Sequence, residues 1–321
     1  MTTAKIQWIA VDPASRRVLE LAEKVADAST TVLITGESGT GKDQLARWIH
    51  ERGARRNAPL LKIDCASLPS ELIESELFGH ERGAFTGAVA RKPGRLEMAQ
   101  DGTIVLDEVA ALAPGMQAKL LRVLEERKFE RLGGNETLKM EARLMALTNT
   151  DLNRAVAAGR FREDLFFRLN VLSIVVPPLR ERRADIPELA AHFLARLAPV
   201  HGRAETSFAP GTLKFLDAYD WPGNARELKN AIEHALIFGR GAGNDPDKDA
   251  QITPTDFPEI VRAGNTARDG AGGLRSLETL EREAIKETLE ATHYKIGRTA
   301  EILGISRKTL LEKRKKYALL D

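Results

Sequence analysis

The sequence has little cysteine, little net charge and no long hydrophobic run. The single cysteine, Cys65, excludes an intramolecular disulfide and favours a reducing compartment. The formal net charge of +2 neither indicates nor excludes a nucleic acid partner, so the distribution of charge must decide. No apolar run is long enough to span a bilayer, and the N-terminus lacks the apolar core of a signal peptide. These absences predict a cytoplasmic protein without membrane insertion.

The remaining composition is typical of a globular protein, with 43% hydrophobic and 29% charged residues. Short apolar strands alternate with helical patterns over the first half of the chain. The expected strands are 31–35, 60–65, 103–107, 143–148 and 172–176, and the expected first helices are 13–26 and 42–52. Such alternation favours an α/β fold with a mostly parallel sheet. Cys65 ends the second strand and is interpreted as a small core residue.

Four segments are expected along the chain. Residues 1–176 form the α/β subdomain, and residues 177–261 form a second subdomain that is expected to contain only helices between Asp185 and Phe238. Residues 262–276 are rich in Gly, Ala and polar side chains with almost nothing to bury, which predicts a flexible linker. Residues 277–321 form a small all-α unit.

A glycine-rich phosphate loop lies between the first expected strand and the helix that begins at Lys42. Its backbone N–H groups can surround phosphate, the helix N-terminus adds its dipole, and Lys42 reaches the terminal phosphates. The candidate ATP-binding residues here are Gly36, Glu37, Ser38, Gly39, Thr40, Gly41, Lys42 and Asp43. Asp43 is a departure, because a Ser or Thr hydroxyl normally meets Mg²⁺ at this position. The spacing predicts ATP and Mg²⁺ as cofactors.

Two carboxylates follow the apolar strand 103–107. Asp107 is predicted to hold the Mg²⁺ shell and Glu108 to orient the attacking water. ATP hydrolysis also needs positive charge near the γ-phosphate, and Arg162 and Arg168 flank an acidic and apolar segment. By composition these two arginines could equally be ordinary surface residues, and the residues alone do not decide between the two interpretations.

Basic residues outnumber acidic residues from Lys295 to the end of the chain. The pattern predicts a helix-turn-helix: a first helix is followed by a glycine turn at Gly304, a Ser306 cap and a second helix at 307–317. The candidate DNA-binding residues are Ser306, Arg307, Lys308, Thr309 and Lys313. Arg307, Lys308 and Thr309 are expected near base edges and Lys313 near phosphate. Apolar positions between 277 and 289 predict either a dimer seam or packing within the unit.

The segment ELFGHERGAFTGA at residues 76–88 resembles the signature of sigma-54-dependent transcriptional activators, the bacterial enhancer-binding proteins. The phosphate loop GESGTGKD and the segments FREDLFFRLNVLSIVVPPLRERRADIP and WPGNARELKNAIEHAL are similar to those of the same family. The resemblance covers roughly residues 6–240, and the C-terminal unit resembles the Fis-type domain of the family. Family members usually carry Glu at the position of Asp43, so this departure does not argue against ATP binding.

The resemblance implies an AAA+ ATPase with a helical lid that forms a hexameric ring and binds enhancer DNA through dimers. The enzyme would remodel the closed complex of sigma-54 RNA polymerase to the open complex. Arg162 and Arg168 would be arginine fingers, Thr148 and Asn149 a sensor pair, and Arg226 a second sensor at the nucleotide. Residues 128–138 would form a second surface loop. The sigma-54 contact would be made by Gly83, Ala84, Phe85, Thr86, Gly87 and Ala88.

Asp64 stands where the family more often has Asn, which is thought to hydrogen-bond the Walker B glutamate. A carboxylate cannot donate that bond unless it is protonated. Asp64 is therefore expected to hold Glu108 less firmly than an asparagine would.

About ten residues precede the first expected helix, a layout that resembles the phage-shock activator in lacking an N-terminal regulatory domain. This layout implies control by a separate inhibitory protein or by expression. Two alternatives remain: a DNA-binding regulator of ordinary promoters that uses an ATPase-like core mainly to oligomerise, and a protein-remodelling AAA+ chaperone. Loss of the loop signature or of Glu108 would favour the first alternative. The sequence contains both the loop signature and Glu108.

Overall fold

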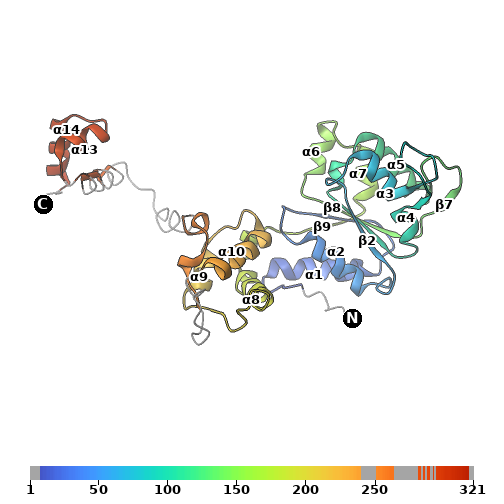
Figure 1. The fold of residues 1–321 in the computed structure, drawn as a ribbon, viewed down its shortest axis with the longest axis horizontal. Coiled ribbons are helices and arrows are strands. Elements are labelled where there is room, and N and C mark those ends of the chain that lie inside the picture. The colour runs from blue at the N-terminus through green and yellow to red at the C-terminus, as the bar shows by residue number, and fades with distance from the viewer. Residues whose placement is uncertain are drawn as a thin grey trace. The chain divides into compact units, whose positions relative to one another are not determined.

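The computed structural model describes residues 8–239, 251–263, 281, 282, 285, 288, 289, 292 and 294–317 (Figure 1). The chain divides into two compact units, residues 1–261 and residues 262–321. Most of the expected linker, and positions 277, 280 and 284 of the expected apolar seam, lie outside the described residues.

The first unit is built on a five-stranded parallel sheet with the strand order β2-β5-β8-β1-β9. The strands are β1 (Val32–Thr35), β2 (Leu60–Asp64), β5 (Thr103–Asp107), β8 (Arg143–Thr148) and β9 (Leu172–Val175). Each lies within one residue of its expected bounds. Because neighbouring strands are parallel, their carboxyl ends, with the side chains that follow them, meet at one edge of the sheet.

Helices cover both faces of the sheet, as Figure 1 shows. On one face, α1 (Pro13–Ala26) and α2 (Lys42–Arg52) bury a core that includes Val18, Leu45 and Ile34. The other face packs against α3 (Ser70–Phe78), α5 (Pro114–Glu126) and α7 (Glu163–Leu169). Alternate residues of the three central strands β1, β5 and β8 enter opposite cores, which is why these strands are largely apolar. The predicted α/β fold is confirmed.

Local signals set several element ends. The carboxylate of Asp12 accepts a hydrogen bond from the Ala14 backbone N–H at 2.9 Å, and Pro13 occupies the first turn of α1. Cys65 is 2% exposed at the end of β2, as expected for a small core residue. Burial, with the nearby carboxylates of Asp64, Asp107 and Glu108, raises the pKa of its thiol to about 12.

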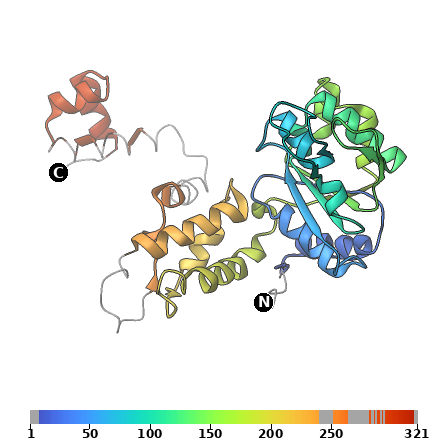
Figure 2. The same ribbon diagram turned by 45° about the vertical axis from the view of Figure 1, so that its right-hand side comes forward.

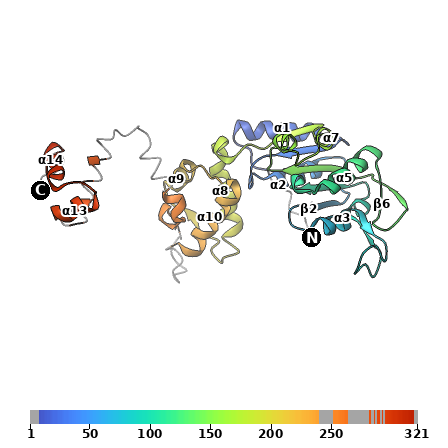
Figure 3. The same ribbon diagram turned by 90° about the horizontal axis from the view of Figure 1, so that it is seen from above.

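Several shorter elements lie on the side of the sheet that packs against α3 and α5. They are β3 (Gly79–His80), β4 (Lys92–Pro93), α4 (Arg95–Met98), the 3-10 turn η1 (Val109–Ala111), β6 (Lys128–Glu130), β7 (Thr137–Lys139) and α6 (Leu152–Ala157). Strands β3 and β4 pair antiparallel, as do β6 and β7. In Figure 3 the segment between β3 and β4 projects from the body of the domain beside β6.

A helical lid follows the sheet (Figure 2). The lid has its own core, which includes the fully buried Trp221. It contains the 3-10 turns η2 (Leu179–Glu181), η3 (Arg183–Asp185) and η5 (Pro254–Asp256) and the helices α8 (Ile186–Leu197), α9 (Thr212–Ala218) and α10 (Asn224–Phe238). The expectation of helices only between Asp185 and Phe238 is wrong in one detail. Strand β10 (Ser207–Phe208) pairs with β11 (Gln251–Ile252), because this pairing buries Ile252 in the lid core.

Buried polar groups join the lid to the N-terminal segment and the phosphate loop. Asp185 is fully buried and accepts hydrogen bonds from the backbone of Val11 at 2.7 Å and Asp12 at 2.8 Å. Arg182 donates to the carbonyl oxygen of Thr40 at 2.6 Å, and its guanidinium lies 5.8 Å from the centre of the Trp8 ring. The buried carboxylate is thus compensated by donors, as burial of a charge requires.

The second unit contains the helix-turn-helix. Helix α13 (Ile296–Ile302) is followed by Gly304 at φ +65° and by α14 (Arg307–Lys316). Ser306 caps α14 by accepting from the Thr309 backbone N–H at 3.0 Å, as predicted. Two positions of the expected apolar seam, Ile285 and Leu289, are buried in the core of this unit. At these positions the apolar pattern serves packing within the unit.

Candidate ATP site and its surface loops

The phosphate loop joins β1 to α2 and depends on its glycines. Gly39 and Gly41 adopt φ angles of +78° and +101°, and a Cβ at Gly39 would lie 2.3 Å from the carbonyl oxygen of Gly223. Only glycine fits that close approach to the lid. Thr40 Oγ1 donates to the carbonyl of Glu37 at 2.8 Å and stabilises the turn.

Lys42 begins α2 and folds back over the loop. Its Nζ donates to the carbonyl oxygens of Gly36 at 2.8 Å and Glu37 at 3.1 Å. Burial lowers the pKa of Lys42, although the carboxylates of Glu108 and Asp107 act in the opposite direction. The ammonium is therefore held inside the phosphate loop, between the loop carbonyls and the acidic strand end.

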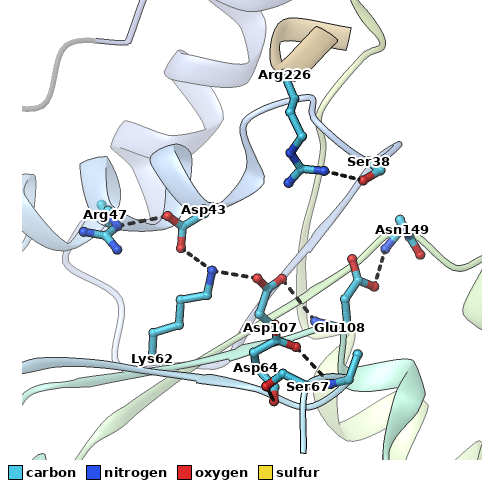
Figure 4. A network of polar contacts seen from close by, with 11 residues as sticks. Ser38, Asp43, Arg47, Lys62, Asp64, Ser67, Asp107, Glu108, Asn149 and Arg226 are labelled. Atoms are coloured by element: carbon cyan, nitrogen blue, oxygen red, sulfur yellow. Dashed lines mark hydrogen bonds and ion pairs between the residues drawn. The ribbon is translucent and has the colours of Figure 1, made fainter. Parts of the chain in front are cut away.

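Three lid residues reach the phosphate loop. Arg226 donates to Ser38 Oγ at 2.8 Å, which places this predicted sensor beside the loop (Figure 4). Asn224 donates to the carbonyl of Ser38 at 3.0 Å, and Arg180 forms two hydrogen bonds of 2.6 and 2.9 Å with the carboxylate of Glu37. Arg180 lowers the pKa of that carboxyl. Sequence reasoning singled out neither Arg180 nor Asn224, although both lie in segments that resemble the family.

The ends of β5 and β8 bring the predicted catalytic carboxylate to a backbone donor. Glu108 has φ +52°, an unfavourable region for a residue with a side chain, and such residues gather at functional sites. Its Oε2 accepts a hydrogen bond from the backbone N–H of Asn149 at 3.2 Å (Figure 4). Asp107 Oδ1 accepts from the Glu108 N–H at 3.1 Å. Thr148 is fully buried, and its Oγ1 accepts from the Thr150 backbone N–H at 3.0 Å.

Lys62 was missed by sequence reasoning and lies at the centre of this site. Its Nζ is 2.7 Å from Asp107 Oδ2 and 2.9 Å from Asp43 Oδ1. Asp43 also pairs with Arg47 at 3.0 Å. Partial burial would lower the pKa of Lys62, but its hydrogen bonds with Asp107 and Asp43 outweigh this effect and raise it. A lysine in the middle of the otherwise apolar stretch LLKI was the available signal.

A cavity of about 330 Å³ opens beside Glu108, the predicted catalytic carboxylate. Its lining includes Glu108, Asn149 and Arg160. The carboxylate oxygens of Asp107 and Glu108 are the kind of ligand that Mg²⁺ prefers, directly or through water, so these residues fit the expected metal. The cavity leaves room next to Glu108 for water and for a group supplied from outside.

Asp64 is in register with Asp107 at the end of β2. Its carboxylate accepts from the Ala66 backbone N–H at 2.9 Å, and its carbonyl accepts from Ser67 Oγ at 3.0 Å. Within the described ranges, the structure records no hydrogen bond or ion pair between Asp64 and Glu108. The side chain is thus satisfied locally, and Glu108 is held from β8 instead. A role for Asp64 at Glu108 stays a prediction.

Replacing Asp64 by Asn is expected to lower basal ATP turnover about threefold and to increase the fold-stimulation by sigma-54 polymerase, because the new amide could donate to Glu108 while its oxygen keeps the Ala66 N–H. Steady-state ATPase assays with and without that polymerase measure both effects. Asp64→Ala, which removes the Ala66 contact and offers no donor, is the matched control. Unchanged rates in Asp64→Asn would show that this position does not act on Glu108.

The two candidate finger arginines lie at the ends of α7. Among the described residues, neither forms a hydrogen bond or ion pair with the phosphate loop of its own chain. Arg162 pairs with Asp164 at 2.6 Å, and both side chains are about half exposed. Arg168 donates to the carbonyl of Leu124 at 2.9 Å. The described unit therefore does not bring them to its own ATP site. A role in trans stays a prediction.

The loop between β3 and β4 holds the six candidate sigma-54 contacts. Gly83 and Gly87 have φ angles of +82° and +106° and no neighbouring atom within 4 Å of an added Cβ, so the tip is open at both glycines. The Phe85 side chain is 41% exposed, and its ring meets His80 edge-on at 5.0 Å. Ala84 lies against Gly133 of the second surface loop, while Ala88 is buried.

A buried arginine ties this loop to its neighbours. Arg131 forms ion pairs with Glu81 and Glu97 at 2.9 Å each and with Glu136 at 2.6 Å. These acids come from the base of the first loop, from α4 and from the second loop. Residues 128–138, the expected second surface loop, thus contact the loop of residues 83–88 and its base.

The candidate DNA contacts on the basic helix α14 differ in exposure and in the partners that their side chains already have. Arg307 and Lys308 are exposed, whereas the Thr309 hydroxyl shares a hydrogen bond of 2.8 Å with Ser306. Lys313 pairs with Glu281, which also accepts from Tyr317 Oη at 2.6 Å. Lys313 therefore helps to fix the helix within the unit.

A parallel-sheet domain with a phosphate loop, an acidic strand end and a contacting helical lid, followed by a helix-turn-helix unit, defines an AAA+ ATPase joined to a DNA-binding module. Family models agree: the sigma-54 interaction domain matches residues 8–175, the AAA+ ATPase lid domain residues 180–272, and the Fis family of bacterial regulatory proteins residues 276–317. The chain belongs to the sigma-54-dependent transcriptional activators.

Individual relatives support the same assignment. The transcriptional regulatory protein ZraR of Salmonella typhimurium is 44% identical over 312 residues, which cover 97% of this chain and 69% of the relative. The regulatory protein AtoC of Escherichia coli K12 is 43% identical over 324 residues, covering 98% and 68%. The crystal structure of NtrX from Brucella abortus in complex with ATP matches with a TM-score of 0.72 and 35% identity over 97% of this chain and 69% of that one.

These relatives are longer than the chain. They do not support the expected likeness to activators without an N-terminal regulatory domain, which stays an expectation. Among the described residues, no helix has the length and apolar character required to cross a membrane.

Proposed function

We propose that this protein hydrolyses ATP with Mg²⁺ and uses the energy to remodel the closed complex of sigma-54 RNA polymerase to the open complex while bound to enhancer DNA. The main support for the proposal is the loop of residues 83–88, which exposes Phe85 and Thr86 at its tip, in the same domain as a site that retains Glu108. A regulator that kept its core only to oligomerise would need neither feature.

The chain's own residues divide the chemical work. Lys42 binds the terminal phosphates, and Asp107 would hold Mg²⁺, directly or through water. When bound, Mg²⁺ neutralises phosphate charge. Glu108 orients the attacking water, and the Asn149 N–H at 3.2 Å sets the position of its carboxylate. Arg226 contacts the nucleotide from the lid, so that lid position follows nucleotide state.

Assembly completes the site. Subunits form a hexameric ring in which Arg162 and Arg168 of one subunit reach the γ-phosphate held by its neighbour. Their position at the ends of α7, with no recorded contact to their own phosphate loop in the described unit, supports this arrangement. The helix-turn-helix units bind enhancer DNA as dimers, and a separate inhibitory protein in the cytoplasm controls the ring.

Removing everything after Gly273 is expected to abolish specific enhancer binding and to leave ATP turnover within about twofold, because the two compact units have separate cores. Footprinting on enhancer DNA and an ATPase assay of the same preparation measure the two activities. Arg307→Ala in the full chain is the matched point variant, expected to weaken footprinting alone. A truncated protein that protects the same site would contradict the assignment of the C-terminal unit.

A further inference from the structure

We propose that Lys62 is a positioning residue of the nucleotide site that neutralises Asp43 and Asp107 until Mg²⁺ takes over this role. The inference rests on the ATP binding proposed above. Figure 4 shows the Lys62 side chain between the two carboxylates. Its Nζ lies 2.9 Å from Asp43 Oδ1 and 2.7 Å from Asp107 Oδ2, so one ammonium joins the first turn of α2 to the end of β5.

Charge balance in the site requires such a cation. Asp43, Asp107 and Glu108 bring three carboxylates to the region that must receive a triphosphate. Lys42 donates to the carbonyls of Gly36 and Glu37 at 2.8 and 3.1 Å, and among the described residues it forms no ion pair with Asp43 or Asp107. Lys62 is therefore the cation that contacts both Asp43 and Asp107, and without it their charges would repel each other and the phosphates.

The same contact orients the carboxylate of Asp107. Its Oδ1 accepts from the Glu108 N–H at 3.1 Å and its Oδ2 accepts from Lys62, so both oxygens have fixed partners. The Asp107 side chain is 20% exposed, so this ion pair is screened less than one on the open surface. A divalent cation that binds through Asp107 must share or displace the ammonium, which links Mg²⁺ binding to Lys62.

This linkage also accounts for the carboxylate at position 43, where a hydroxyl is usual in phosphate loops. Asp43 cannot donate a hydrogen bond as that hydroxyl does, and its charge opposes phosphate. Lys62 and Arg47 together neutralise it, at 2.9 and 3.0 Å. Because Arg47 pairs with Asp43 and no pair with Asp107 is recorded for it in the described chain, the two cations can be separated by experiment.

The test is the affinity of the full chain for ADP, measured by calorimetry in EDTA and again with saturating Mg²⁺. In Lys62→Met the ratio of the two dissociation constants, EDTA over Mg²⁺, is expected to rise about fivefold, because the metal must now supply the missing charge. Two control variants are expected to keep this ratio within about twofold of the original value. Lys62→Arg keeps a cation at position 62, and Arg47→Met leaves the contacts of Lys62 with Asp43 and Asp107 in place.

Asp43→Asn is expected to move the ratio the opposite way, about twofold down, and combined with Lys62→Met to return it toward the original value. A structural role alone would change both dissociation constants in parallel and leave the ratio unchanged. An unchanged ratio in Lys62→Met and in Asp43→Asn overturns the inference. If the original chain binds ADP in neither buffer, the proposed ATP site itself fails.

Discussion

Replacing Lys42 by alanine is expected to lower ATP turnover at least about a hundredfold, the size of effect that follows removal of one preorganised charge from a reaction centre. Lys42 is buried within the phosphate loop, where water cannot replace its ammonium. Arg168→Ala is expected to cost as much by removing charge from the neighbouring site. Steady-state phosphate release by each purified variant, with Lys119→Ala as the surface control, measures both losses.

Mixing the two inactive variants distinguishes a shared site from a self-contained one. Interfaces that combine the phosphate loop of Arg168→Ala with the finger of Lys42→Ala are intact, so an equal mixture should recover about a quarter of the original turnover if fingers act in trans. A mixture as inactive as its components, or full turnover by the original chain at a dilution where it is monomeric, would show that these arginines do not complete a neighbour's site.

Thr86→Ala is expected to abolish transcription from sigma-54 promoters, by at least about a hundredfold, while ATP turnover stays within about twofold. Residues 83–88 lie between β3 and β4, and none of the recorded polar contacts of the phosphate loop or of Glu108 involves them. The separation arises because the loop contacts the polymerase and not the nucleotide. Parallel assays of ATP hydrolysis and of transcript formation measure it.

Gly115→Ala, at an exposed position of α5 with no atom within 4 Å of the added Cβ, is a matched control that should keep both activities. If Thr86→Ala drove open-complex formation at the normal rate, the assignment of the loop would be wrong. If it lost ATP turnover as well, the loop would belong to the catalytic site.

The elements of the fold that could be predicted were those with local signals. Asp12 and Pro13 mark the start of α1, the loop glycines and Lys42 mark the start of α2, and Ser306 marks the start of α14. Strand β10 was not predicted, because two residues are too few to show the alternation of apolar and polar residues that is typical of a strand. Phe208 reveals its role only once Ile252 is beside it.

The candidate site was predictable where one short motif carries it and not where distant residues meet. Glu37 and Arg180 are 143 positions apart, and Lys62 reaches Asp43 and Asp107 only because β2 lies next to β5. Asp64 shows the reverse case. The resemblance implies that Asp64 faces Glu108, yet its carboxylate accepts from the backbone N–H two residues later, a local contact that competes with any long-range one.

The most direct test of the central claim is promoter melting by purified components. Sigma-54 polymerase, an enhancer-bearing promoter and this protein would be probed with permanganate, which modifies unpaired thymines. We expect melting with ATP and Mg²⁺, and none with ADP, with Lys42→Ala or with Thr86→Ala. Melting with ADP, or melting by Thr86→Ala at the normal rate, would contradict the claim that ATP hydrolysis acts on sigma-54 through this loop.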